Sequence, residues 1–419
     1  MQPSENTRGF SWLSLLQFSL SGLAILMLWG IAGTFAVVAL VPVFGSGSLR
    51  RVDASGFLLA AGLAWIGLLL VPSAWFALLR LINRPVNLPV RLTWRKVGGL
   101  IWLMIPVVLA GYGASVTPEI GWLLLPPLNV LALSIPTVWY LALGGRGLRS
   151  SSPQSAWGVF GAGLMLGPGL ILFFELMGGV IAVVVLVFWL APLPGFTEEL
   201  QQLMTLVQSS PTLDPSDLLP FAEKYLLRES VLVGGLLFIA GFVPLLEEFL
   251  KPVGMWLMNK QTLTPARGFL AGMLSGAAFG LFESLLQGVS GEAWITLAIA
   301  RSGTSLIHIF NSGLVGWGFA LAWQQRSLWP WLTRFAVAVL IHGLWNGNTV
   351  MIALALTPGQ DLVGEGWGIM GGSMLVVLSV GCFIALLIIN RRLQREVQTA
   401  EEPPAPVAES RELPPHAEE

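Results

Sequence analysis

Long runs of apolar residues, repeated along almost the whole chain, limit its possible folds more than any other feature. A helix needs about 20 apolar residues to cross a bilayer. About ten such stretches can be read: 13–43, 56–82, 97–116, 120–144, 157–192, 229–258, 267–289, 293–323, 329–356 and 366–390. Charged residues make up only 11% of the 419 positions, against about 25% in a typical soluble domain. The sequence therefore predicts an all-α, polytopic transmembrane helix bundle of about ten spans.

The basic residues of the connecting segments predict the orientation of the bundle, because cytoplasmic loops carry an excess of Lys and Arg. Basic residues follow the second, fourth, sixth, eighth and tenth stretches: Arg80, Arg84, Arg91, Arg95, Lys96, Arg146, Arg149, Lys260, Arg267, Arg326, Arg391, Arg392 and Arg395. In a ten-span bundle all of these lie on one side, and Arg50 and Arg51 are the exceptions. Both termini are therefore predicted to be cytoplasmic.

Composition divides the chain into five segments. Residues 1–192 are predicted to form an N-terminal scaffold of about five spans, and residues 193–228 an extracytoplasmic acidic loop with a short amphipathic helix. Residues 229–356 hold four spans that carry polar residues, and residues 357–395 hold the last span. The tail, 396–419, is rich in Pro, Glu and Ala and is predicted to be disordered and cytoplasmic.

The residue content of the chain excludes several functional classes. The net charge of −1 argues against a nucleic-acid partner. The single cysteine, Cys382, excludes a disulfide framework and a zinc site built from cysteines. The aspartates all lie in predicted loops, so a pair of intramembrane catalytic aspartates is excluded: Asp53, Asp214, Asp217 and Asp361.

Ionisable residues are unevenly distributed among the spans. Each costs at least about 2.5–3.5 kcal/mol at bilayer depth, so each is a functional candidate. The first four spans contain essentially none, and the fifth contains Glu175. The sixth to ninth spans hold most of them: Glu247, Glu248, Lys251, Glu283, Arg301, His308 and His342. These four spans are predicted to form the site, and the front of the molecule its scaffold.

The Glu247–Glu248 pair suits acid–base chemistry. Lys251 follows by four and three residues, so on a helix it can neutralise one of the two carboxylates. The second carboxylate then needs another partner, a proton or a metal, which suits a general acid or base. The alternative is a charge pair at a helix end near the cytoplasmic interface.

Two histidines, His308 and His342, lie deep in neighbouring spans, and Glu283 lies in a third span without a local cation. Asn346 follows His342 by four residues and shares its helix face. Taken singly, each histidine could be a hydrogen-bonded structural residue, and Glu283 a protonated one. Together, imidazole and carboxylate suit zinc, or the activation of a water without metal.

Four short motifs follow in order on these spans: EEFLK at 247–251, FGLFE at 279–283, HIFNSG at 308–313 and HGLWN at 342–346. This order resembles the PrsW family of intramembrane proteases, which is related to the CAAX-endopeptidase and bacteriocin-processing superfamily. The resemblance covers about 229–350. It implies hydrolysis of peptide bonds within the membrane of a bacterial cell, with a membrane-anchored protein as substrate.

The resemblance also implies roles for individual residues. Glu247 or Glu248 would activate water, and Asn346 would help to hold the oxyanion. Lys251 would support the acidic pair. A metal, with zinc as one candidate, or the scissile carbonyl would be bound by three residues: Glu283, His308 and His342. The zinc motif HExxH is absent.

Two other functions compete with proteolysis. A proton- or ion-coupled transporter would use the same buried Glu and His as a relay, but it predicts polar residues in other spans and internal repeats, and neither is seen. A catalytically silent membrane scaffold of the same fold would tolerate the loss of a motif residue, yet none is missing.

Overall fold

The computed structural model describes residues 11–46, 52–84, 97–209, 219–258, 263–356 and 364–401, and within these ranges it is all helical. Ten segments are long and apolar enough to cross a membrane, which confirms the predicted ten-span bundle. They are α1 (Trp12–Ser46), α2 (Ala54–Leu81), η2 with α4 (Gly98–Leu103, Met104–Ser115), α5 (Pro118–Gly144), α6 (Pro153–Leu190), α9 to α11 (Glu229–Trp256), α12 (Pro265–Leu285), α13 (Ala293–Gln325), α14 (Trp329–Ala355) and α15 (Gly364–Glu401). The cytoplasmic location of both termini stays a prediction.

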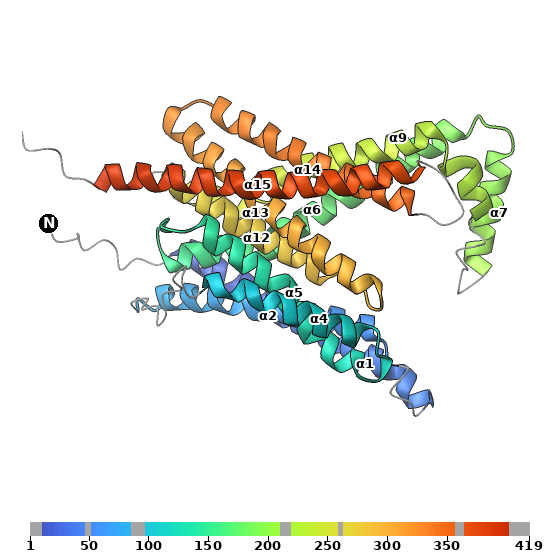
Figure 1. Ribbon diagram of the computed structural model, residues 1–419, viewed down its shortest axis with the longest axis horizontal. Coiled ribbons are helices and arrows are strands. Elements are labelled where there is room, and N and C mark those ends of the chain that lie inside the picture. The colour runs from blue at the N-terminus through green and yellow to red at the C-terminus, as the bar shows by residue number, and fades with distance from the viewer. Residues whose placement is uncertain are drawn as a thin grey trace, which may run out of the picture.

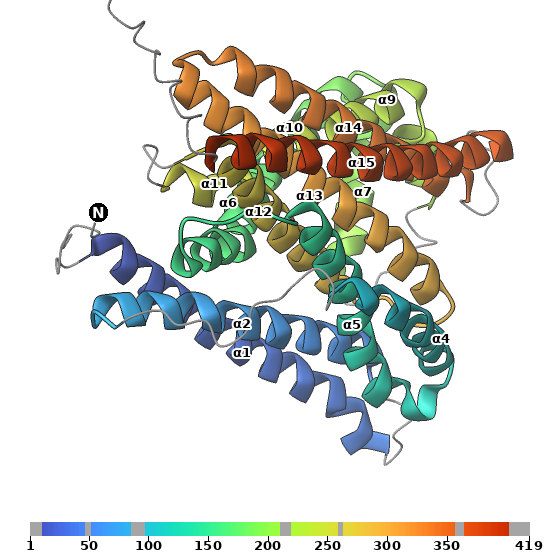
Figure 2. The ribbon, with the colours of Figure 1, turned by 60° about the vertical axis from the view of Figure 1, so that its left-hand side comes forward.

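Two helices, α12 and α13, form the centre of the bundle. In their most apolar windows 78% and 89% of the residues are buried. The helices α5, α6, α14 and α15 pack around them, while α1 and α2 run as a pair along one edge (Figures 1 and 2). Because α12 and α13 face protein rather than lipid, they can carry polar side chains, and their hydropathy of 1.3 is the lowest among the spans.

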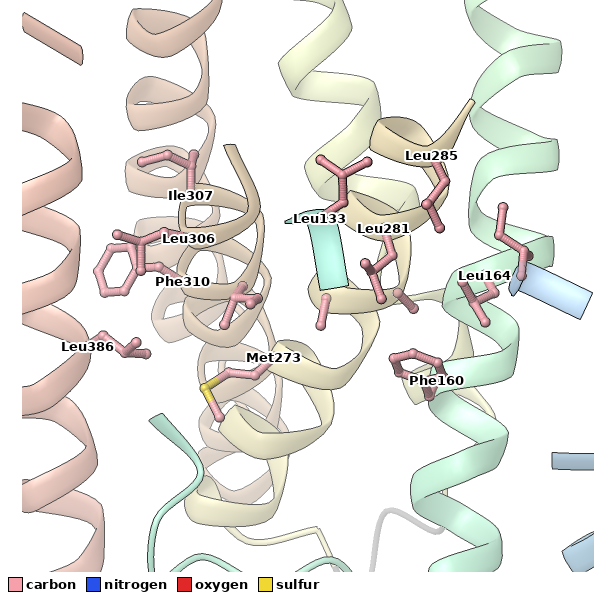
Figure 3. Packing of buried hydrophobic residues seen from close by; sticks show 14 of the residues in the cluster. Leu133, Phe160, Leu164, Met273, Leu281, Leu285, Leu306, Ile307, Phe310 and Leu386 are labelled. Atoms are coloured by element: carbon pink, nitrogen blue, oxygen red, sulfur yellow. The ribbon is translucent and has the colours of Figure 1, made fainter. Parts of the chain in front are cut away.

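The central core joins side chains from eight of the described helices, among them α6, α12, α13 and α15. Figure 3 shows side chains of α12, among them Met273 and Leu281, between Leu164 of α6 and Phe310 of α13, with Leu386 of α15 beside Met273. All five are buried. This packing fixes the positions of the helices that carry the polar residues.

Glycines of α12 allow α13 to approach closely. A Cβ built on Gly272 would lie 2.0 Å from the backbone oxygen of Ser312, and one on Gly276 would lie 2.2 Å from the backbone oxygen of His308. Small residues at such spacing let membrane helices pack backbone against backbone. The contact at Gly276 sets the height of His308 relative to α12.

Gly272→Ala is therefore expected to destabilise the folded protein, because the added methyl group meets backbone that cannot rotate away. Overpacking of this kind costs about 1–3 kcal/mol. Unfolding in mixed micelles, followed by circular dichroism, measures the change. Gly30→Ala on α1, whose Cβ would meet nothing within 4 Å, is the control. Equal stability of the two variants would contradict this account of the α12–α13 contact.

The sixth span is irregular, and this irregularity positions the acidic pair. It consists of α9 (Glu229–Leu237), a π-helical turn η4 (Phe238–Phe242), α10 (Val243–Leu250) and α11 (Val253–Trp256). Pro252, which cannot continue the hydrogen-bonding pattern, directly follows Lys251, the C-cap residue of α10. A π-helical turn leaves backbone groups for other partners and often occurs near functional sites.

The segment between the fifth and sixth spans contains α7 (Phe196–Ser209) and a π-helical turn η3 (Ala222–Leu226), in agreement with the predicted helix in this loop. Phe196 and Tyr225 pack edge to face with ring centroids 5.0 Å apart. Lys224 forms an ion pair with Glu199, and this hydrogen bond raises the pKa of the Lys224 ammonium. Its extracytoplasmic location stays a prediction.

At the other end of the chain, α15 extends past the predicted end of the last span and into the segment predicted to be disordered from 396, ending at Glu401. The rest of that tail lies outside the described residues.

Candidate active site

Three helices, α10, α13 and α14, bring together five of the polar residues singled out in the sequence. Glu247, Glu248 and Lys251 lie at the end of α10, His308 on α13 and His342 on α14. All five are buried, with exposures between 0% and 7%. Their side chains form one hydrogen-bonded cluster, so these predicted site residues do converge.

Lys251 lies at the centre of this cluster. Its Nζ is 2.8 Å from Glu247 Oε2, 2.8 Å from Glu248 Oε1 and 2.8 Å from His308 Nδ1. The ammonium also lies over the ring of Phe279, 4.5 Å from its centroid. Lys251 thus serves both carboxylates, whereas the sequence predicted that it would neutralise one.

The neighbours of His308 define its tautomer. Its Nε2 lies 2.9 Å from Glu283 Oε2, and a carboxylate can only accept, so Nε2 donates. Its Nδ1 faces Lys251, and an ammonium can only donate, so Nδ1 accepts. The neutral imidazole therefore directs its lone pair from Nδ1 into the cluster.

His342 has the complementary arrangement. Its Nδ1 lies 2.9 Å from Glu248 Oε1 and donates to it. The other ring nitrogen, Nε2, faces Glu247 Oε2 at 3.8 Å. Each histidine is thus held by a carboxylate on one side, and its other ring nitrogen faces the cluster.

Arg301 supplies the cation that the sequence did not assign to Glu283. Its guanidinium donates to Glu283 Oε1 at 2.8 Å and to Gln287 Oε1 at 3.1 Å. Glu283 lies in the last turn of α12, and its side chain is 36% exposed, so it is less deeply buried than predicted. The spacing of seven residues between Arg301 and His308, two turns of one helix, was the available signal for this contact.

The group that could hold a metal is Glu247, His308 and His342, whose potential ligand atoms lie within 4.8 Å of one another. The family resemblance instead implies Glu283 together with the two histidines as the residues that bind a metal or the scissile carbonyl. In the structure Glu283 binds the opposite side of the His308 ring, so it orients this histidine, as carboxylates do behind metal-binding imidazoles.

The donor set is chemically suited to a divalent ion. One carboxylate and two imidazoles occur in hydrolytic zinc sites, and both imidazoles here have a carboxylate behind them. In addition, Glu248 Oε2 is buried and has no hydrogen-bond partner in the described part of the chain. The residues present therefore fit a metal.

Asn346 lies outside the hydrogen-bonded cluster. Its amide donates to the backbone oxygen of Ile239 at 3.2 Å and so ties α14 to the π-helical turn η4. Gly343 packs against the same turn, with its Cβ position 2.3 Å from the Ala240 oxygen. The predicted role of Asn346 at an oxyanion stays a prediction.

Comparison with known proteins gives one family. The model of the family described as PrsW family intramembrane metalloprotease matches residues 156–386. This match is longer than the 229–350 segment that carries the motifs, because it takes in α6 and most of α15, which pack around α12 and α14. No curated protein and no solved structure matches the chain.

Proposed function

The chain belongs to the PrsW family of intramembrane metalloproteases, and on this premise we propose that it cleaves membrane-anchored proteins at the buried Glu/His cluster. The main supporting observation is the arrangement of the two histidines. A carboxylate holds each ring on one side, and the other nitrogen faces the cluster, His308 Nδ1 toward Lys251 and His342 Nε2 toward Glu247. We place the protein in a bacterial cell membrane.

Three residues would hold the metal: Glu247 through a carboxylate oxygen, His308 through Nδ1 and His342 through Nε2. Zn²⁺ is the ion that we propose, because one carboxylate and two imidazoles form known hydrolytic zinc sites. When bound, the ion would supply Lewis acidity toward the scissile carbonyl.

The remaining residues would orient the ligands and move a proton. Two buried carboxylate oxygens, Glu247 Oε2 and Glu248 Oε2, have no hydrogen-bond partner among the described residues, and the first of them is ion-paired with Lys251. Glu248 Oε2 is therefore the acceptor best able to take a proton from the attacking water. The other oxygen of Glu248 holds the His342 ring, and Glu283 holds the His308 ring. Asn346 would stabilise the oxyanion through its second N–H.

An apolar groove suits a hydrophobic substrate segment. It has a volume of about 780 Å³ and lies between α14 and the η4–α10 segment, with Ala240, Leu245, Val339 and Gly343 among its lining residues. Gly343 directly follows His342. We propose that the membrane segment of the substrate reaches the cluster from this side.

The test compares membrane proteomes, with mapping of new N-termini, from cells that express wild type or His342→Ala at matched levels. A membrane protein that accumulates intact in the variant, with its cleavage fragment lost, is the expected result. Arg392→Ala, on the exposed end of α15, is the control. If no protein changes while the variant is folded and abundant, the chain acts as a silent scaffold of the same fold.

A further inference from the structure

We propose that the ammonium of Lys251 is a built-in cation that occupies the ligand cluster in the metal-free protein and moves off two of the ligands when a divalent ion binds. This inference rests on the proposed function, because it takes Glu247, His308 and His342 as the ligands.

The first argument is competition for the same atoms. The ammonium lies 2.8 Å from Glu247 Oε2 and 2.8 Å from His308 Nδ1. A zinc ion would bond to such atoms at about 2.0–2.2 Å. An ion and an ammonium attached to the same two atoms would occupy nearly one position, and two cations so close repel strongly. Lys251 and a metal therefore exclude one another at these two atoms.

The second argument is that the ammonium keeps two favourable contacts when it leaves Glu247 and His308. Glu248 Oε1, 2.8 Å away, and the ring face of Phe279, 4.5 Å from its centroid, both lie outside the proposed ligand set. A charge over an aromatic face is stabilised when it is desolvated. A rotation of the flexible lysine side chain can thus release Glu247 and His308 while the ion pair with Glu248 persists. The ammonium of Lys251 therefore stays paired with Glu248 throughout this movement.

The third argument is charge. With neutral imidazoles, the two carboxylates and the ammonium of Lys251 give the cluster a net charge of −1, and a divalent ion brings it to +1. Without the lysine the cluster carries −2, and the same ion neutralises it. Lys251 therefore weakens metal binding but stabilises the metal-free protein, in which two buried neighbouring carboxylates would otherwise repel each other.

The experiment is a Co²⁺ titration of metal-stripped, full-length protein in lipid nanodiscs, followed by visible absorption, together with thermal unfolding at each Co²⁺ concentration. Lys251→Met is expected to bind Co²⁺ at least about tenfold more tightly than wild type, the scale on which neighbours of ligands affect metal affinity. Without metal, Lys251→Met should also have a lower melting temperature than wild type, and Co²⁺ should raise its melting temperature by more. Lys224→Met, which removes an exposed lysine outside the spans, should leave both quantities unchanged.

Equal or weaker Co²⁺ binding by folded Lys251→Met would overturn the role of Lys251 and leave the metal function intact. Absence of Co²⁺ binding by wild type and variant alike would contradict the metal function itself, and this inference with it. A variant that folds only with Co²⁺ supports the proposal, whereas one that stays unfolded even with Co²⁺, while His308→Ala folds, contradicts it. Lys251→Arg keeps the charge, so it should bind no more tightly than wild type, and tighter binding would also overturn the proposal.

Discussion

Glu247→Gln is expected to lower the rate of substrate cleavage by about 10²–10³-fold, the scale of loss when a group that stabilises the transition state is removed. The substitution keeps the shape of the side chain but removes the negative charge that faces Lys251 Nζ and His342 Nε2. It therefore removes the only carboxylate of the proposed ligand set. Purified protein in proteoliposomes, with the substrate identified from the proteome comparison, measures the loss.

The matched control is Glu229→Gln, which makes the same chemical change at an exposed position in the first turn of the same span. It should retain the wild-type rate. If Glu247→Gln keeps more than about a tenth of the activity, while the equivalent change at Glu248 abolishes it, the loss per residue assigns the essential carboxylate to Glu248 instead.

The spans and the polar residues could be predicted because both depend on local sequence. Apolar runs of sufficient length mark helices in lipid, and a charged residue within such a run is costly enough to stand out. His308 and His342 satisfied this criterion, and the structure brings them within one cluster, with ring centroids 5.2 Å apart.

The division of roles among the carboxylates could not be predicted, because it depends on which side of each imidazole a carboxylate occupies. Glu283 and Glu247 are both Glu residues near a helix end, and no spacing distinguishes them. Only the three-dimensional packing places Glu283 behind His308 and Glu247 in front of it. The π-helical turn before α10 was missed for a similar reason, since Phe238–Phe242 reads as ordinary apolar helix.

The irregular sixth span carries the acidic pair, and the regular α12–α13 pair fixes where the acidic pair and His308 lie. Gly276 brings the backbone of His308 close to α12, and the carbonyl of Lys251 accepts a hydrogen bond from Ser275 of α12. The acidic pair and the first histidine are thus positioned from one central helix. His342 lies on α14, and a hydrogen bond from Asn346 connects α14 to the sixth span.

Glu283→Gln distinguishes an orienting carboxylate from a metal ligand. The amide can still accept a hydrogen bond from His308 Nε2, but it loses the charge that Arg301 holds in place at 2.8 Å. If Glu283 only orients His308, metal affinity and cleavage rate should fall by about 10–100-fold and remain measurable. If Glu283 is itself a ligand, Glu283→Gln should lose as much metal as His308→Ala, which is expected to lose it altogether.

Metal content after dialysis against a buffered Zn²⁺ solution, together with the cleavage rate at saturating Zn²⁺, separates these two cases. Glu292→Gln, an exposed Glu at the start of α13, is the control and should match wild type. Arg301→Met should shift metal affinity in the same direction as Glu283→Gln but by less, because Glu283 then keeps its contact with His308. If Arg301→Met lost more metal affinity than Glu283→Gln, the guanidinium would act on the cluster through a contact other than this carboxylate.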